Sequence, residues 1–217
     1  MPDLAIAVEE ASAVPFAVAP TIAFGLQVVN ADPREAIHTV VLRCQIQIEV
    51  TRRPYSAPDQ ERLRDLFGEP ERWGQTLRSM LWTHASTVVP AFTGSTSFQL
   101  QVPCTFDFNV AATKYFHGVS EGEIPLNLLF SGTVFYAAGE CALQVSPIAW
   151  DKEARFRLPV QVWRTMMDEY YPNSAWLSLR RDVFERVYGY KVRHGIQTWE
   201  AALERLLEAV EQEPVRG

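Results

Sequence analysis

The stretch TVVLRCQIQIEV, from Thr39 to Val50, alternates between side chains of two kinds. Successive side chains of an extended chain point to opposite faces, so one face collects the even-numbered residues and the other the odd-numbered ones. The even-numbered face carries Val40, Leu42, Cys44, Ile46, Ile48 and Val50. The opposite face carries Val41, Arg43, Gln45, Gln47 and Glu49. The pattern predicts a long β-strand with one face in a core, and it leaves open what the amide-bearing face meets.

The composition is typical of a folded domain with a large core. The chain has 217 residues, of which 47% are hydrophobic, and we expect one domain with a helical appendage. Its formal net charge is -6, and its sequence pI is near 5.3. A general nucleic-acid binder needs clustered Lys and Arg, so we expect no nucleic-acid partner. Binding to anionic lipid surfaces is disfavoured for the same reason.

The N-terminal region is uncharged from Ala11 to Ala31 and contains an Ala-Val-Ala that resembles a signal-peptidase site. A signal peptide begins with positive charge, whereas Asp3, Glu9 and Glu10 come first here. Pro15 and Pro20 would also interrupt a membrane helix. We therefore expect a cytoplasmic protein with no membrane insertion, whose residues 1–20 form a loose or extended N-terminal arm.

Alternation or uncharged apolar runs predict five or six antiparallel strands. The predicted strands cover residues 21–30, 39–50, 95–110, 124–136 and 141–146. Pro103 removes a backbone donor, so the strand that contains it is expected at a sheet edge or beside a bulge. The predicted sheet domain spans residues 21–157.

Helical spacing interrupts this sheet domain once and then dominates the C-terminal part of the chain. A helical insertion is predicted over residues 56–83, with Ser56 as the cap of a first helix. A second helix would open at Pro70 and place Trp73, Leu77 and Leu81 on one stripe. Residues 158–217 are predicted to form helices that pack on the sheet. The fold class expected from these patterns is α+β.

The chemistry-bearing residues show no catalytic or metal-ligating pattern. Cys44, Cys104 and Cys141 lie far apart in apolar runs, which is typical of buried thiols in a reduced compartment. The histidines are scattered singly at positions 38, 84, 117 and 194, without the close spacing of metal ligands. Phosphate-binding loops and the Gly-x-Ser-x-Gly elbow are also missing from the sequence. We therefore expect no catalytic residues, no metal and no cofactor in a protein that is not an enzyme.

A rival hypothesis keeps a ligand pocket open. Asp107, His117 and Asp151 could line a pocket between the sheet and the helices, as an enzyme or a small-ligand binder would require. Clustering of these three residues around one deep cavity would favour that hypothesis.

The outward positions of the predicted strands carry many amides and few charges. A neutral amide costs less to desolvate than an ion and bonds in either sense, so such a face is suited to being covered by a protein. The predicted partner-binding residues are Arg43, Gln45, Gln47, Gln99, Gln101 and Gln144. We expect a protein partner and self-association, with a plain solvent-facing sheet as the alternative.

A resemblance to a known family is carried by six stretches: RCQIQIEVTRRPYS, LFGEPERWGQTLRSMLWTH, VPAFTGST, PCTFDFNVAATKYFHG, PLNLLFSGTVFY and WDKEARFRLPVQVWRTMMDEYYPNSAW. Together they resemble an uncharacterised actinobacterial family of unknown function, over nearly all of the chain after Pro20. Members of that family are typically encoded near genes for a nickel-iron uptake hydrogenase. The resemblance implies an accessory, assembly or scaffold role with a hydrogenase subunit as the partner, and it brings no catalytic residues.

The predicted order of elements also resembles the SecB-like export-chaperone fold, in which a long-stranded antiparallel sheet is followed by helices. That analogy implies a chaperone that holds immature subunits, and an exposed apolar groove would distinguish such a holder.

Overall fold

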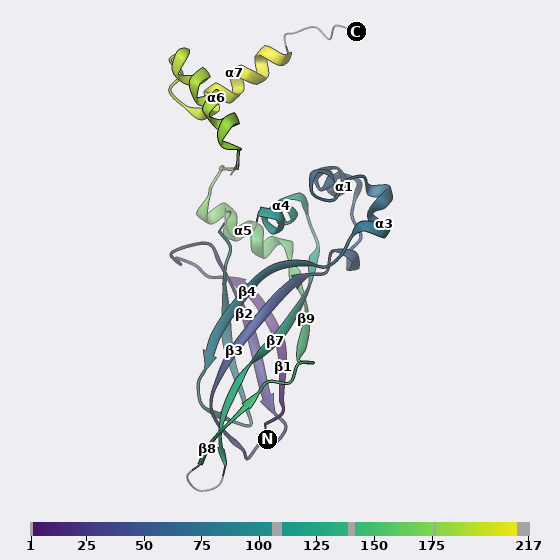
Figure 1. The fold of residues 1–217 in the computed structure, drawn as a ribbon, viewed down its shortest axis with the longest axis vertical. Helices are drawn as coiled ribbons and strands as arrows, with labels where there is room; N and C mark the ends of the chain where they lie inside the picture. The colour runs from purple at the N-terminus through teal and green to yellow at the C-terminus, as the bar shows by residue number, and fades with distance from the viewer. Residues whose placement is uncertain (1, 106–109, 139–141, 176, 212–217) are drawn as a thin grey trace. The chain divides into compact units, whose positions relative to one another are not determined.

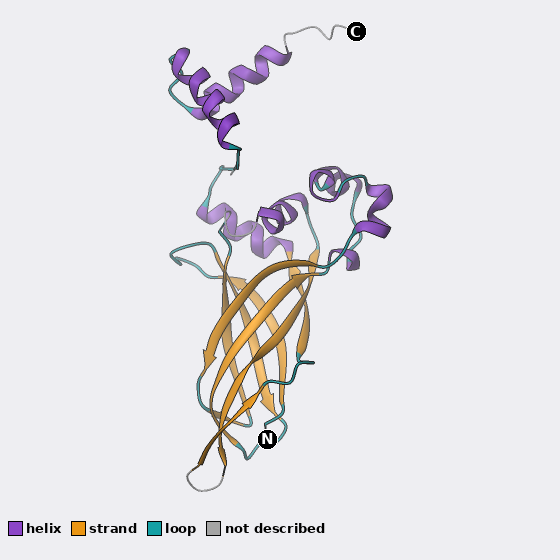
Figure 2. Ribbon diagram, in the orientation of Figure 1, coloured by secondary structure: helices purple, strands orange, loops and turns teal. Residues whose placement is uncertain are grey.

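The computed structural model describes residues 2–105, 110–138, 142–175 and 177–211 (Figure 1). The described chain combines helices with antiparallel sheets, which confirms the α+β class (Figure 2). It divides into two compact units, Met1–Ser174 and Ala175–Gly217. The first unit contains both sheets, and the second contains two helices. No helix among the described residues combines the length and apolar character needed to cross a membrane.

The strands of the first unit form two antiparallel sheets. The first sheet has the order β1–β2–β6, with β1 at Leu4–Ala13, β2 at Thr21–Asn30 and β6 at Ser95–Pro103. The second sheet has the order β4–β3–β7–β8, with β4 at Met80–Val89, β3 at Ala36–Ile48, β7 at Glu123–Ala138 and β8 at Ala142–Pro147. Two further strands complete it: β5 at Phe92–Thr93 pairs with β3, and β9 at Glu153–Pro159 pairs with β7. The predicted strands are therefore divided between two sheets.

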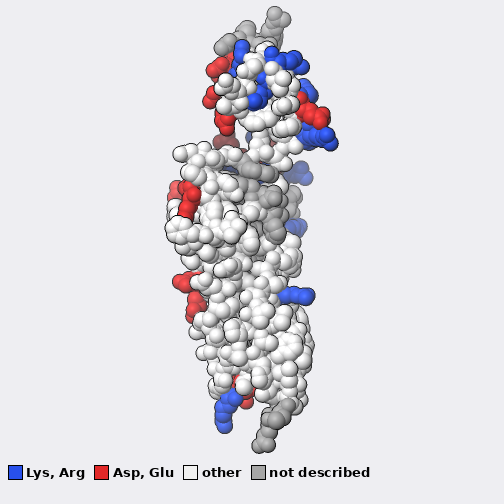
Figure 3. Space-filling model, turned by 90° about the vertical axis from the view of Figure 1, so that its left-hand side faces the viewer, with Lys and Arg blue, Asp and Glu red and all other residues white. Residues whose placement is uncertain are grey.

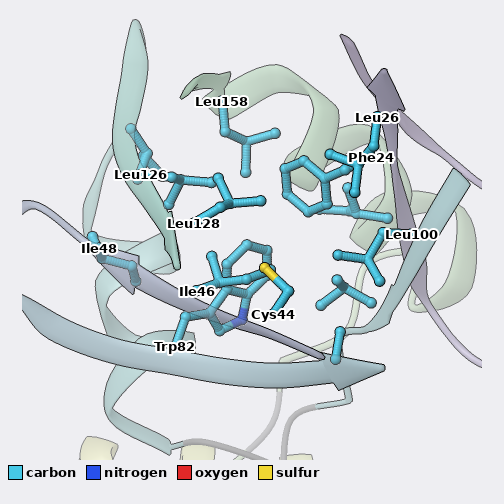
Figure 4. Packing of buried hydrophobic residues seen from close by; sticks show 14 of the residues in the cluster. Phe24, Leu26, Cys44, Ile46, Ile48, Trp82, Leu100, Leu126, Leu128 and Leu158 are labelled. Carbon is cyan, nitrogen blue, oxygen red and sulfur yellow. The ribbon is translucent and has the colours of Figure 1, made fainter. Parts of the chain in front are cut away.

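The two sheets enclose one hydrophobic core. All the even-numbered apolar residues from Val40 to Val50 are buried, as the alternation predicts. Figure 4 shows Phe24, Leu26 and Leu100 of the first sheet with Cys44, Ile46 and Leu128 of the second. The Phe24 ring meets Trp82 edge-on at 6.2 Å and Phe156 at 6.0 Å between ring centroids. This packing buries one face of each sheet and leaves two outer faces.

The N-terminal arm, predicted as loose or extended over residues 1–20, contains an extended strand at Leu4–Ala13. These residues form β1, which pairs with β2 along its length. Leu4 is buried, and Ile6 and Val8 pack against the core. Pairing supplies partners for the backbone groups of β1, and its apolar side chains pack against the core.

The helical insertion begins as predicted and ends earlier. After the short η1 at Val50–Arg52, α1 at Ala57–Arg62 is capped by the Ser56 hydroxyl, which accepts a hydrogen bond from the Asp59 amide at 3.3 Å. Three short elements follow: α2 at Arg64–Phe67, η2 at Pro70–Arg72 and α3 at Trp73–Thr76. The predicted helix through Leu81 is wrong, because β4 begins at Met80 and buries Trp82, while Leu81 points outward.

The end of β6 also departs from the prediction. A strand was expected from Ser95 to Val110, but β6 stops at Pro103, and Val110 begins α4 at Val110–Gly118. Residues 106–109 lie outside the described residues. Pro103 supplies no backbone donor, which is consistent with a strand end at this residue.

The C-terminal helices are shared between the two units. The predicted boundary at residue 158 falls inside β9, and α5 at Val160–Tyr170 follows directly and packs against β1 and β2. The other two helices, α6 at Arg181–Arg193 and α7 at Trp199–Glu211, belong to the second unit and pack against each other. Of the helices expected to pack on the sheet, α5 does so.

Gly132 provides a test of the close approach between β3 and β7. It has a φ of +143°, and a Cβ added there would overlap the carbonyl oxygen of Val41. We expect Gly132→Ala to lower the free energy of unfolding by more than the roughly 1–3 kcal/mol that such a φ costs alone. Urea unfolding followed by circular dichroism measures this loss.

Gly74→Ala is the matched control for this prediction. Gly74 lies in α3, and a Cβ added there would meet no atom within 4 Å. Alanine is the better helix former by about 0.5–1 kcal/mol, so this variant should be as stable as the wild type or slightly more stable. Equal stability of the two variants would contradict the role assigned to Gly132.

Candidate protein-binding face

The outer face of the second sheet presents rows of side chains that cross β4, β3 and β7. Val88, Val41 and Thr133 face one another across the strands and make a row of two apolar side chains and one hydroxyl. Further along the strands, a second row contains His84, Gln45 and Leu129, and a third contains Leu81, Gln47 and Asn127. Arg43 lies between the first and second rows, beside Ser86 and Ser131. Val88 is 63% exposed and Leu81 is 43% exposed, so apolar side chains at both ends of β4 meet solvent.

The outer face of the first sheet continues this surface around one side of the core. Strand β6 ends the first sheet and β4 ends the second, and these two strands lie next to each other. Gln99 and Gln101 point outward from β6, opposite Gly25 and Ala23 of β2. Figure 3, which views the side along which β4 runs in Figure 1, shows a broad area without Lys, Arg, Asp or Glu.

We call this area the charge-free face and define it by the outward residues of β4 and β6. They are Leu81, His84, Ser86, Val88, Ser95, Ser97, Gln99 and Gln101. All eight are exposed, and each side chain is apolar, an amide, a hydroxyl or an imidazole. The face can therefore bind by apolar contact and neutral hydrogen bonds without desolvating an ion.

The structure brings some of the predicted partner-binding residues together and separates others. Gln99 and Gln101 lie on the charge-free face, while Arg43, Gln45 and Gln47 lie beside it on β3. Gln144 is placed elsewhere. It pairs with Tyr136 of β7, whose buried hydroxyl donates a hydrogen bond of 2.8 Å to the Gln144 side chain. Gln144 is exposed as well, but it lies on the opposite face of β8 from the exposed Leu143 and Val145.

The β4 part of the face was missed because the 73–81 spacing suggested a helix. Another signal was present in the sequence: the chain contains no Asp, Glu, Lys or Arg from Ser79 to Thr105. This run becomes β4, β5 and β6, whose outward positions a solvated sheet would be expected to fill partly with charges.

Charged side chains border this region at the far edge of the second sheet. A cleft of about 270 Å³ is lined by Arg52, Arg155 and Arg157 together with Glu49. Each arginine has a carboxylate nearby: Arg52 lies 3.4 Å from Glu49, and Arg157 lies 3.7 Å from Glu123. Exposed pairs of this kind stabilise a fold by about 0–1 kcal/mol at most. We interpret them as a solvated rim and not as an anion site.

Of the three residues proposed for a rival ligand pocket, His117 and Asp151 are described, and they lie apart. His117 of α4 packs on Trp163 of α5 and lines a cavity of about 190 Å³, smaller than the roughly 300–1,000 Å³ of typical ligand pockets. Burial and the charge of Arg164 lower the pKa of His117. Asp151 precedes β9, whereas Trp163 follows it, so the strand separates Asp151 from this cavity by about 20 Å. Asp107 lies outside the described residues.

The described cysteines occupy the core. Cys44 and Cys104 are free and buried, as the sequence predicts, and burial raises the pKa of each thiol to about 12. Such thiols are poor nucleophiles at neutral pH. Cys141 lies outside the described residues. No group of three or more His, Cys, Asp or Glu side chains that could hold a metal occurs in the described part of the chain.

Asp59 is the one buried carboxylate among the described residues and ties the helical insertion to the start of β7. It accepts hydrogen bonds from Arg62 at 2.8 Å and from the Ser120 amide at 3.1 Å, and it faces Arg53 at 3.5 Å. Arg53 also donates to the carbonyl of Glu123 at 2.7 Å. Burial alone would raise the pKa of Asp59, but these hydrogen bonds and charges outweigh it and hold that pKa below its usual value. The network joins residues of one chain, and the buried Nε of Arg53 has no hydrogen-bond partner among the described residues.

Comparison with known proteins assigns the chain to a family. A family profile described as a family of unknown function, DUF6084, matches residues 1–215. The chain belongs to the DUF6084 family. No curated protein matches it.

Similar solved structures include a candidate late embryogenesis abundant (LEA) protein in solution, with 14% identity, coverage of 73% of each chain and a TM-score of 0.33. A candidate ApaA protein from Bordetella pertussis has 15% identity, coverage of 72% of this chain and 93% of that one, and a TM-score of 0.27. A β-glucosidase from Kluyveromyces marxianus has 10% identity over 72% of this chain and 15% of the enzyme, with a TM-score of 0.24.

The lowered pKa of Asp59 predicts a specific pH dependence. Asp59→Asn should lower the free energy of unfolding at pH 7 by about 1.5–3 kcal/mol, because it removes the charge from these hydrogen bonds. A lowered pKa stabilises the fold above the ordinary aspartate value and ceases to do so as the pH falls through the folded-state value. The gap between variant and wild type should therefore close only below about pH 4. Urea titrations between pH 7 and pH 3 measure it.

Asp65→Asn is the matched control, because Asp65 makes an exposed ion pair with Lys114 at 2.5 Å. It should change the free energy of unfolding by less than about 1 kcal/mol at pH 7. A loss for Asp59→Asn that stays constant down to pH 3 would contradict the electrostatic account.

Proposed function

We propose that this protein is a non-catalytic accessory, assembly or scaffold factor that acts by binding another protein through its charge-free face. The observation that carries the proposal is the absence of Asp, Glu, Lys and Arg from the exposed residues of β4 and β6 that make up that face.

The free energy of desolvation favours a protein partner at this face. Burying an unpaired ion is far more costly than burying a hydroxyl or an amide whose hydrogen bond is replaced across the interface. Gln99 and Gln101 can each donate and accept, and Ser86 and Ser97 add small groups that permit close approach. A protein surface can match these groups one by one.

The arrangement of the side chains also follows the anatomy of protein interfaces. Leu81, Val88 and Val41 supply exposed apolar area on the second sheet. The arginine-lined cleft lies at the far edge of the same sheet, whereas the exposed Arg43 lies between these apolar residues, beside Ser86. Protein interfaces commonly combine an apolar, neutral centre with a charged border. This pattern lets a protein bury apolar surface in a complex and stay soluble when it is free.

The family resemblance supports a hydrogenase as the partner. The resemblance of the six stretches to an actinobacterial family implies, as an expectation, genes near those of a nickel-iron uptake hydrogenase, and on that basis a subunit of such an enzyme is the proposed ligand of the charge-free face. In this role the protein supplies no reacting group. It holds or positions a subunit during assembly or in the finished complex.

Capture from an actinobacterial host that produces a nickel-iron uptake hydrogenase tests this proposal. The tagged wild-type chain should enrich a hydrogenase subunit over an untagged control, as quantified by mass spectrometry. Gln99→Glu/Gln101→Glu should weaken binding to the purified subunit by about tenfold or more, because two carboxylates would be desolvated without partners.

Gln75→Glu/Gln161→Glu is the matched control, with the same chemical change at two exposed glutamines of α3 and α5. It should bind like the wild type. Failure of the wild type to enrich any hydrogenase component would remove the proposed partner. Equal binding by the two double variants would show that the charge-free face is not the binding surface.

A further inference from the structure

The loop between β1 and β2, residues 14–20, presents two apolar side chains to solvent. Phe16 is 96% exposed, and Val18 is fully exposed as well. The loop has the sequence VPFAVAP, which contains no charged or polar side chain. In Figure 1 it reaches out to the left of the upper ends of β1 and β2, the side that Figure 3 views. A phenyl ring that stays in water adds no burial to the stability of the free protein.

Phe16 is also held in a backbone conformation that costs free energy. Its φ of +57° lies in the left-handed region, where a bulky residue is an outlier. Strain of this kind persists only where the surrounding structure imposes it, and it is concentrated at binding and active sites. Because the Phe16 ring is exposed, its packing does not offset the strain in the free protein. A contact that offsets it has to come from another molecule.

Hydrogen bonds to the rest of the first unit fix the loop. The Val14 amide donates to the carbonyl of Thr21 at 2.9 Å, which closes the loop at its base. The Tyr170 hydroxyl of α5 donates to the carbonyl of Ala17 at 2.8 Å. Two prolines within the loop restrict its backbone further. A loop that is already ordered loses little conformational entropy when its side chains enter a partner.

The loop continues the charge-free face. Thr21, which follows the loop, pairs with Pro103 at the end of β6. Gln101 of the charge-free face comes two residues earlier on β6 and points to the same side of the strand as Pro103. The two uncharged runs of the sequence, residues 11–31 and 79–105, therefore adjoin at this corner of the first sheet. A protein that covers the charge-free face lies within reach of the loop.

A lipid surface is a less favourable occupant than a protein. The exposed Asp168 and Glu169 directly precede Tyr170, whose hydroxyl holds the loop, and carboxylates repel anionic headgroups. The loop brings no Lys or Arg to such headgroups. The side chains of Phe16 and Val18 also contain fewer carbon atoms than one myristoyl chain, which by itself anchors a protein only marginally.

We propose that residues 14–20 are a second part of the binding surface, and that Phe16 inserts into an uncharged apolar pocket of the protein that covers the charge-free face. The inference rests on the proposed function and deepens it, because it states what the partner must present: a neutral surface for β4 and β6 and, beside it, a pocket for a phenyl ring. Aromatic side chains that fill pockets carry much of the binding energy of protein interfaces, while neutral contacts around them exclude water.

Isothermal titration calorimetry of the full chain with the purified hydrogenase subunit tests the insertion. Phe16→Ala should raise the dissociation constant by about tenfold or more, because a buried phenyl ring is lost. Phe16→Gly should weaken binding as much. Its midpoint of urea unfolding should nevertheless be no lower than that of the wild type, because glycine adopts the left-handed conformation without strain. This variant separates loss of the ring from loss of the fold.

Trp150→Ala is the matched control, since it truncates an aromatic side chain that is 94% exposed and lies outside this surface. It should bind like the wild type. Weaker binding by Gln99→Glu/Gln101→Glu with unchanged binding by Phe16→Ala would overturn the insertion and leave the charge-free face supported. The reverse result would support the insertion and overturn the charge-free face.

Two further results would overturn the insertion. A wild type that binds no hydrogenase subunit would overturn it together with the proposed partner. Co-sedimentation of the wild type with phosphatidylcholine vesicles, lost in Phe16→Ala, would assign the loop to a lipid surface.

Discussion

The packing of the two sheets against each other is the constraint on which the rest of this structure depends. Phe24 of the first sheet contacts Trp82 and Phe156 of the second through ring edges, and the alternating apolar residues of β3 complete the layer between them. Because side chains of a strand alternate, fixing the inward set also fixes the outward set. A register slip of one residue would bury Gln45 and Gln47 and expose Ile46. The hydrophobic core therefore determines which polar residues are displayed.

The outer surface of β4 and β6 is unusual because it carries no charged side chains, although exposed charges at these positions would not destabilise the free protein. Strands β4 and β6 lie next to each other, and their outward residues join into one neutral area. Charged pairs are present on the same sheet, at the cleft lined by Arg155 and Arg157. The neutral area thus has a definite border, and a protein that covers it would desolvate no ion.

The sequence predicts the elements whose pattern is strong and local. Period-two alternation correctly predicts most of β3 and the start of β6, although it extends β6 beyond Pro103. Ser56 and Gly68 mark the limits of the first inserted helical stretch. Strand β1 is missed because alanines alternate with Ile6 and Val8, which gives little contrast between its faces. In β4, the four-residue spacing of Trp73, Leu77 and Leu81 suggests one helix, although the spacing spans a helical turn and a strand.

The candidate face depends on information that a single strand does not contain. Alternation predicts that Gln99 and Gln101 point outward, but only the pairing of strands places them next to β4 and beside Gln45. Gln144 is a second residue whose surroundings its own strand does not predict. The register of β8 with β7 pairs Gln144 with Tyr136, whose hydroxyl donates a hydrogen bond to the Gln144 side chain. The absence of charged residues between Ser79 and Thr105 can be read from the sequence. It indicates a neutral surface only once the structure shows that outward side chains of β4 and β6 are exposed.

Hydroxyl-radical footprinting of the protein, alone and bound to its captured partner, tests the central claim most directly. Leu81 and Val88 of the charge-free face should be oxidised in the free protein and protected in the complex. Trp150, which is 94% exposed and lies outside this face, should react equally in both. Unchanged oxidation of Leu81 and Val88 in the complex, with protection at other residues, would contradict the account.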